Sequence, residues 1–132
     1  MNNKYKILSI ISLIIVMTVS INIQAANFSV TIKDDLGKKI KLETRPERIV
    51  SLSPSNTEML FALGLGDNIV GVTQSANYPE AVFKKEKIGT ITDPNIEKIV
   101  SLEPDLIIAS AINKMSTLNK LKDLGIKVAG FN

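Results

Sequence analysis

The sequence contains no cysteine and no histidine in its 132 residues. Without cysteine the chain can form neither a disulfide bond nor a thiolate nucleophile. Without histidine it has no Ser-His triad, and the two absences together exclude a zinc site of the usual nitrogen and sulfur ligands. The Gly-x-Ser-x-Gly pattern of hydrolase nucleophile elbows is missing as well. Enzyme chemistry would therefore need paired carboxylates or a metal, and we expect no enzyme.

Neither sign of charge is in large excess. Lys and Arg number 16 against 13 Asp and Glu, which gives a net charge of +3. Residues 1–25 hold two of the lysines and no acid, so the remainder has 14 basic against 13 acidic residues. No basic block with interleaved aromatic residues is present, and we therefore expect no nucleic acid partner.

The amino-terminal segment has the pattern of a secretory signal peptide. Lys4 and Lys6 precede an apolar run at 7–19, and small residues follow at 22–26. A membrane anchor is the alternative, but the run is shorter than the ~20 residues that a span needs. We expect cleavage of residues 1–25 and, since no cysteine can carry a lipid, a free protein in the periplasm or another exported compartment.

The stretch 48–73 predicts a parallel strand–helix–strand unit around which the chain is organised. The apolar run 49–52 is typical of a strand buried on both faces. Ser55 and Glu58 have the spacing of a capping box that begins the helix, and Gly64 is suited to end it. The tetrapeptide Ile-Val-Ser-Leu recurs at 99–102, where its flanks instead predict a helix.

The remaining chain continues this alternation of strands and helices. We expect a β-hairpin before the unit, with strands at 28–32 and 40–42, covering the edge or bottom of the sheet. After it we expect a short helix at 79–85, an extended segment at 88–91, a helix from 96, a strand at 106–109, a helix at 115–124 and a strand at 126–130. The helix from 96 would be capped by Asp93 or Asn95, with Pro94 in its first turn.

The pattern favours an α/β fold, a Rossmann-like parallel sheet with helices on both faces. The residues expected on the core-facing sides of the helices are Met59, Leu60, Leu63, Ile96, Ile99, Val100, Met115, Leu118, Leu121 and Leu124. Ligands of such sheets sit beyond the carboxyl ends of the strands. The candidate ligand-binding residues there are Ser53, Pro54, Ser55, Ser75, Asn77, Ile91, Thr92 and Ser110. The alternative for each is an ordinary solvated loop residue.

An ordered set of short motifs resembles a known family. The set comprises IVSLSPSNTE at 49–58, VGVT at 70–73, YP at 78–79, NIEKI at 95–99, EPDLIIA at 103–109 and LGIKV at 124–128. It closely resembles the amino-terminal lobe of class III periplasmic binding proteins, the receptors of ABC importers for cobalamin, ferric siderophores and haem. The resemblance covers 28–132.

The resemblance implies one lobe of a two-lobe receptor, residues 26–132, without its carboxyl-terminal lobe. Such a receptor is a monomer that captures a metal chelate between its lobes and delivers it to the ABC permease subunits in the membrane. It holds no cofactor or metal of its own, because any iron or cobalt arrives inside the ligand. A truncated remnant or a stand-alone interaction lobe is the alternative, and an exported α/β hydrolase is less favoured.

The resemblance also assigns a role to Glu97. In the family a glutamate at the start of this helix docks into arginines of the permease, and the alternative is an interaction with the helix dipole alone. Glu58 needs no role beyond its capping box. Cobalamin receptors carry aromatic residues near the positions of Ser75 and Ile91, and this departure weakens the expectation of cobalamin.

Overall fold

The computed structural model describes residues 28–35 and 37–131, so the predicted signal peptide lies outside the described residues. Within those ranges no helix has the length and apolar character to cross a membrane. The elements in chain order are β1 (Val30–Lys33), β2 (Lys39–Leu42), β3 (Ile49–Ser51), α2 (Pro54–Ala62), the 3-10 helix η1 (Gly66–Asn68), β4 (Ile69–Val72), the 3-10 helix η2 (Glu80–Lys84), β5 (Glu86–Lys87), α3 (Ile96–Ser101), β6 (Leu106–Ala109), α4 (Met115–Asp123) and β7 (Lys127–Gly130).

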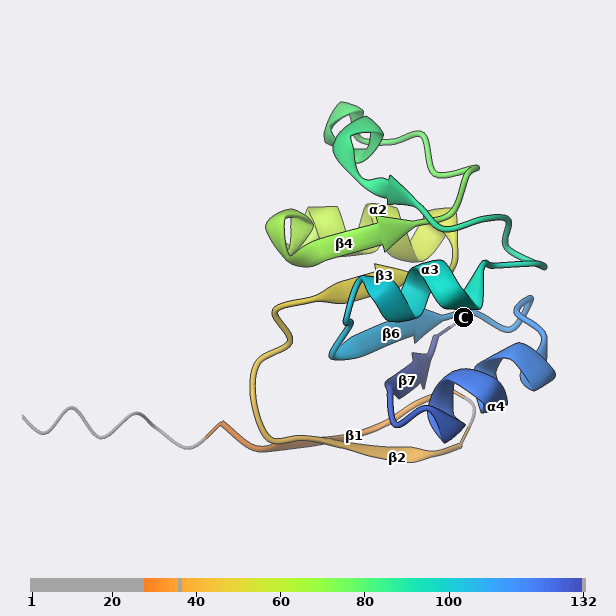
Figure 1. Ribbon diagram of the computed structural model, residues 1–132. Coiled ribbons are helices and arrows are strands. Elements are labelled where there is room, and N and C mark those ends of the chain that lie inside the picture. The colour runs from red at the N-terminus through yellow and green to blue at the C-terminus, as the bar shows by residue number, and fades with distance from the viewer. Residues whose placement is uncertain (1–27, 36, 132) are drawn as a thin grey trace, which may run out of the picture.

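A parallel sheet of five strands, in the order β5-β4-β3-β6-β7, forms the centre of the fold (Figure 1). Ile49 of the central strand β3 lies opposite Ile69 of β4 on one side and Leu106 of β6 on the other. From β3 the chain adds β4 and then β5 on one side, crosses to the other side of β3, and there adds β6 and then β7. This doubly wound order confirms the predicted Rossmann-like sheet.

Apolar layers cover both faces of the sheet. Successive side chains of a strand point to opposite faces, so Ile49 joins one layer and Val50 the other. The first layer packs against α2 through Leu60, and the hairpin strand β2 contributes to it. The second packs against α3 and α4, through Ile99 and Leu118. Helices therefore cover both faces, as the sequence predicts (Figure 1).

The hairpin of β1 and β2 lies beside the edge strand β7. Its strands pair antiparallel, with Val30 opposite Leu42. The backbone N–H of Asp35 donates to the carbonyl of Gly130 at 2.9 Å, and the Asp34 carboxylate accepts from the N–H of Gly130 at 3.1 Å. Because these bonds join the turn to the last strand, the hairpin covers this edge of the sheet, the structural role predicted for it.

Helix α2 begins earlier than the predicted capping box allows. Ser53 is its N-cap, and the Ser53 hydroxyl oxygen accepts from the N–H of Asn56 at 3.3 Å. Pro54 takes the first helical position, where its fixed φ suits the helix and no N–H is needed. The capping box of Ser55 and Glu58 is therefore wrong, because both residues lie inside the helix and are exposed.

The segment before α3 also differs from the prediction. The strand β5 occupies 86–87 and not 88–91; the chain instead folds back so that Gly89 bridges to Pro94. Asn95 is the N-cap of α3, since its side chain accepts from the N–H of Lys98 at 2.8 Å. Pro94 therefore precedes the cap and does not lie in the first turn.

Only part of each predicted helix face reaches the core. Leu60, Ile99, Leu118 and Leu121 are buried and Ile96 is partly buried, whereas Met59, Leu63, Val100, Met115 and Leu124 are exposed. Leu63 and Leu124 are C-cap residues, where the chain turns away from the sheet. Met59 and Val100 are direct neighbours of buried residues, so they point about 100° around the helix from the core.

Candidate functional site

The carboxyl ends of β3 and β6 lie side by side at the point where the chain reverses its direction of winding. Ligands of doubly wound sheets bind beyond the strand ends at such a switch point. Here α2 begins directly after β3, and the turn after β6 leads to α4 on the other face. Ser53, Pro54, Ser55 and Ser110, all predicted ligand-binding residues, come together at this switch point.

Asn113 joins three segments of this rim. Its Oδ1 accepts from the backbone N–H of Ser110 at 2.8 Å, and its Nδ2 donates to the carbonyls of Leu52 at 3.1 Å and Ile91 at 2.8 Å. The residue is only 4% exposed, so these bonds are shielded from water. The sequence prediction missed Asn113. An asparagine three residues after a strand-end serine is the available signal, because asparagine often closes such turns.

A second buried network fixes the start of α2. Asn56 Nδ2 donates to the carbonyl of Ala109 at 3.0 Å and so joins the helix to the end of β6. The Thr57 hydroxyl oxygen lies 2.9 Å from both the Ser51 hydroxyl oxygen and the Ser53 carbonyl. The amino end of α2, with its partial positive charge, is therefore held at the rim. Asn56 and Thr57 were not predicted as site residues.

Ser110 has a side chain without a partner. The residue is 9% exposed, and its hydroxyl oxygen makes no hydrogen bond among the described residues. Its backbone N–H is satisfied by Asn113, which holds the residue in place at the end of β6. A buried hydroxyl normally has a partner, so this group is available to a ligand at the switch point.

A recess of ≈ 500 Å³ lies among the loops that follow β4 and β5. It is lined by Gln74, Ser75, Thr90, Ile91 and Thr92. Three of the predicted residues, Ser75, Ile91 and Thr92, thus share one recess, and the bond from Asn113 to Ile91 joins that recess to the switch point. The predicted residue Asn77 is exposed and does not line it.

Gly89 shapes the loop that carries Ile91 and Thr92. Its φ is +102°, and a Cβ at this position would lie 2.8 Å from the carbonyl oxygen of Asp93. Only glycine fits this close approach without displacement of the backbone. The sequence prediction that Gly89 allows a close backbone approach is therefore confirmed, although the expected strand is not formed there.

Glu97 lies in the first turn of α3 and is exposed, where the sequence predicts it. It makes no ion pair among the described residues. Lys98, also expected to point outward, is half-buried and pairs with Glu86 at 2.7 Å. The N–H of Asn95 donates to the carbonyl of Ile88 at 2.7 Å, so α3 starts beside the loops of the rim. The docking role of Glu97 stays a prediction.

The chemistry that the rim offers is hydrogen bonding by hydroxyl and amide groups. Within the described ranges no three His, Cys, Asp or Glu side chains gather where they could hold a metal. The nearby ammonium group of Lys87 already has a backbone partner, because its Nζ donates to the carbonyl of Ala76 at 2.7 Å. Burial lowers the pKa of Lys87. The arrangement suits the binding of a ligand rich in oxygen or nitrogen.

Comparison with known proteins agrees with this doubly wound fold. The sequence pattern of the family described as periplasmic binding protein matches residues 49–132. The chain is 45% identical over 108 residues to YvrC of Bacillus subtilis strain 168, an uncharacterized ABC transporter substrate-binding lipoprotein, covering 80% of this chain and 34% of YvrC.

Two solved structures extend the comparison. The periplasmic vitamin B12 binding protein BtuF of Vibrio cholerae aligns with a TM-score of 0.61 and 43% identity, over 64% of this chain and 34% of BtuF. The periplasmic haem-binding protein RhuT from Roseiflexus sp. RS-1 aligns with a TM-score of 0.62 and 38% identity, over 66% of this chain and 34% of RhuT.

The fold and the rim define a lobe of the kind that binds a ligand at the carboxyl ends of its strands. The chain belongs to the periplasmic binding protein family. It spans about a third of the length of the curated relatives it matches.

Proposed function

We propose that this chain is a ligand-binding lobe of an ABC importer's substrate-binding protein, and that its ligand is a metal chelate of the siderophore, haem or cobalamin type. The observation that carries the proposal is the grouping of Ser53, Ile91 and Ser110 around the switch point, where the buried Ser110 hydroxyl has no partner within the described part of the chain. The relatives support the class of ligand, because BtuF is described as binding vitamin B12 and RhuT as binding haem.

The lobe binds its ligand and does not transform it. The Ser110 hydroxyl donates to an oxygen or nitrogen at the periphery of the chelate, and the amino end of α2, with its partial positive charge, lies on the same side. Ser75 and Ile91 supply no aromatic surface, which favours a siderophore or haem over cobalamin. The metal enters and leaves inside the ligand, so the lobe needs no metal site of its own.

The permease is the partner that follows from the same assignment. Glu97 is exposed at the start of α3 without an ion pair among the described residues, so it is available to arginines on a membrane subunit. The protein is exported: BtuF and RhuT are described as periplasmic and YvrC as a lipoprotein. Unlike a lipoprotein, these 132 residues include no cysteine for lipid attachment. The receptor acts as a monomer.

A titration of the 132-residue chain with haemin, a ferric hydroxamate and cyanocobalamin tests the ligand-binding proposal. One lobe buries only one side of a ligand, so we expect saturable but weak binding. Replacing Ser110 with alanine should weaken binding roughly threefold to tenfold, the effect of one hydrogen bond. Ser101→Ala is the matched control, because the Ser101 hydroxyl bonds only to the carbonyl of Lys98 within its own helix.

The outcomes of this titration separate the alternatives. Submicromolar binding by the monomer would contradict the division of the site between two lobes. No binding of any of the three chelates would favour a remnant or a stand-alone interaction lobe. Equal affinity of the Ser110→Ala chain and the unaltered chain would show that the ligand does not use the switch point.

Docking needs a separate experiment with a restored second lobe. In a fusion that transports a chelate, Glu97→Arg should slow uptake while the affinity for the ligand is unchanged, because a reversed charge repels the permease arginines. Glu47→Arg is a matched control, since Glu47 is exposed and lies before β3, at the other end of the strands. Normal uptake by the Glu97→Arg fusion would contradict docking through this residue.

A further inference from the structure

A recess of ≈ 290 Å³ lies between the hairpin and the layer formed by α4 and β7. Its lining includes five lysines and no acid: Lys38, Lys39, Lys41, Lys122 and Lys127. We call it the lysine recess. It shares no residue with the rim at the switch point and is therefore a separate feature of the surface.

The ammonium group of Lys122 is the unusual feature of the lysine recess. Its Nζ is shielded from solvent and makes no hydrogen bond among the described residues. Burial lowers the pKa of Lys122, and the positive charge of Lys38 lowers it further. A shielded cation without an acceptor is unfavourable, and a second cation beside it makes it more so.

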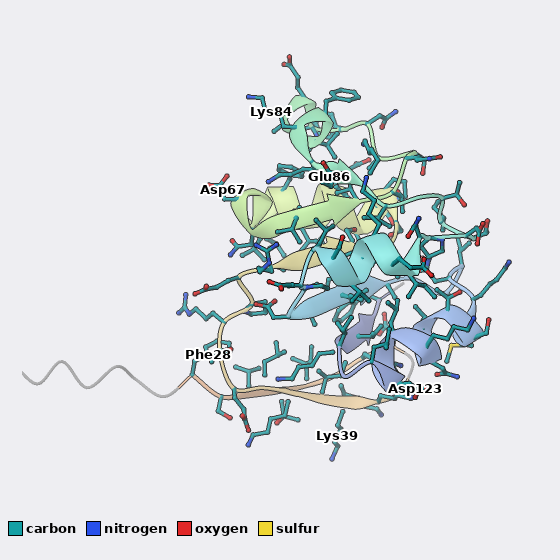
Figure 2. The ribbon with its side chains drawn as sticks, in the orientation of Figure 1. Phe28, Lys39, Asp67, Lys84, Glu86 and Asp123 are labelled. Carbon is teal, nitrogen blue, oxygen red and sulfur yellow. The ribbon has the colours of Figure 1, made fainter. Side chains whose placement is uncertain are left out.

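The acids near the lysine recess do not fully compensate this excess of positive charge. Asp34 favours the charged form of Lys122, but its two oxygens already accept from the backbone N–H groups of Lys38 at 2.6 Å and Gly130 at 3.1 Å. Glu43 pairs with Lys41 at 3.1 Å. Asp123, at the end of α4, makes no ion pair among the described residues (Figure 2).

We propose that the lysine recess binds a phosphate-type oxyanion, with the ammonium groups of Lys38 and Lys122 as its principal ligands. A phosphate group has several acceptor oxygens and can take a charge-assisted hydrogen bond from each ammonium group. Lysine is a common phosphate ligand because it acts as a compact positive charge. The positive charge of Lys39 adds to the attraction, whereas Glu43 offsets part of the charge of Lys41 and Lys127. The recess has room for one phosphate group.

The phosphate could be free in solution or the headgroup of an anionic lipid, and two experiments distinguish these sources. The first is calorimetric titration of the 132-residue chain with inorganic phosphate at low ionic strength, against chloride at matched ionic strength. The second is cosedimentation with vesicles of phosphatidylglycerol, against vesicles of phosphatidylcholine. Binding of inorganic phosphate supports a free anion, and binding of phosphatidylglycerol vesicles alone supports a headgroup.

Variants make the assignment specific. Lys122→Met keeps the apolar stem and removes the charge, and should weaken binding about tenfold or more, the effect of one charge-assisted bond. Lys38→Gln should act in the same direction and serves if Lys122→Met does not fold by circular dichroism. Lys84→Met is the control, since Lys84 is an exposed lysine of η2 that lies far from Lys39 in Figure 2.

The proposal is overturned if neither probe binds the unaltered chain above the chloride or phosphatidylcholine level. It is also overturned if Lys122→Met and Lys38→Gln bind as tightly as the unaltered chain and the Lys84→Met control. Non-specific attraction of all lysines would weaken Lys84→Met as much as Lys122→Met, and this result too contradicts a defined site.

Discussion

The rim at the switch point and the lysine recess are built in opposite ways. At the rim, the neutral side chains of Asn56, Thr57 and Asn113 donate to backbone carbonyls, and one buried hydroxyl, that of Ser110, has no partner among the described residues. In the recess, charged side chains gather and Lys122 has no acceptor there. The rim is thus held together by neutral hydrogen bonds, whereas the recess is a concentration of charge that an anion would stabilise.

The largest effect is expected from Asn113→Ala, which should break the rim without touching the recess. The change removes two buried hydrogen bonds and one partly buried one, and it leaves the N–H of Ser110 and two carbonyls without their partner. The free energy of unfolding should fall by about 2–4 kcal/mol. Urea denaturation measures it, with Asn119→Ala, an exposed asparagine of the following helix α4, as control. A loss no greater than the control's would mean that the network does not hold the rim together.

Gly89→Ala should produce the next largest effect, because it forces a Cβ against the backbone of Asp93 in a left-handed conformation. We expect a loss of about 1–3 kcal/mol in unfolding free energy. Gly64→Ala is the matched control: its φ is +76°, but a Cβ there meets nothing within 4 Å. The difference between the two variants in urea denaturation isolates the close contact, and equal losses would show that the contact is relieved by loop movement.

Lys122→Met tests the recess through pH. At neutral pH the lysine is charged in both the folded and the unfolded chain, but only the folded chain shields that charge from water. Removal of the charge should therefore raise the free energy of unfolding, by roughly 1 kcal/mol after a discount for solvent screening. The folded pKa is lowered below the usual 10.5, so the unfolded chain binds more protons as pH approaches 10.5. The stability of the unaltered chain should therefore rise with pH in that window, and the advantage of Lys122→Met should disappear above 10.5.

Denaturation in phosphate-free buffer from pH 7 to 11 makes this measurement. The groups that face Lys122 are Lys38 and Asp34 from the hairpin turn, and Lys120→Met, an exposed lysine of the same helix, is the control. An advantage of Lys122→Met that is the same at every pH would contradict a shielded charge and would point to better apolar packing instead.

The smallest effect is expected at Glu97. An exposed carboxylate in the first turn stabilises its helix by about 0.3–1 kcal/mol, and the short α3 favours the lower end of that range. Thermal unfolding of Glu97→Ala should therefore be close to that of the unaltered chain, with Glu97→Gln separating charge from size. A loss of several kcal/mol would mean that Glu97 is a structural residue, and its exposure would no longer support a docking role.

The parallel strands were predictable from the sequence because buried strands are continuous apolar runs. The repeated Ile-Val-Ser-Leu shows the limit of this reasoning: its copy at 49–52 begins with strand β3, and its copy at 99–102 ends helix α3. The flanking residues, and not the tetrapeptide itself, indicate which copy forms a strand and which forms a helix. Helix starts were harder, since Ser53 and Ser55 are both suitable caps and Pro54 decides between them.

The rim and the lysine recess also differed in how far the sequence could predict them. The rim residues that follow strands, such as Ser53 and Ser110, could be found because strand ends meet at one edge of a parallel sheet. Asn113 could not, since its three bonds join residues 3, 22 and 61 positions away in the sequence. The lysine recess was also missed, because the hairpin, α4 and β7 that form it are brought together only by the fold.

Chemical-shift mapping is the sharpest test of the claim that the ligand binds at the switch point. The 15N-labelled 132-residue chain is titrated with gallium protoporphyrin IX, a gallium-loaded hydroxamate siderophore and cyanocobalamin. Gallium replaces the paramagnetic iron of haemin and of the siderophore to avoid broadening. We predict that one of these shifts the amides of Ser55, Ser75, Thr92 and Ser110 together, in proportion to one saturation curve, while those of the hairpin stay unchanged. Shifts confined to the hairpin and α4, or no saturable shift with any of the three, would contradict the claim.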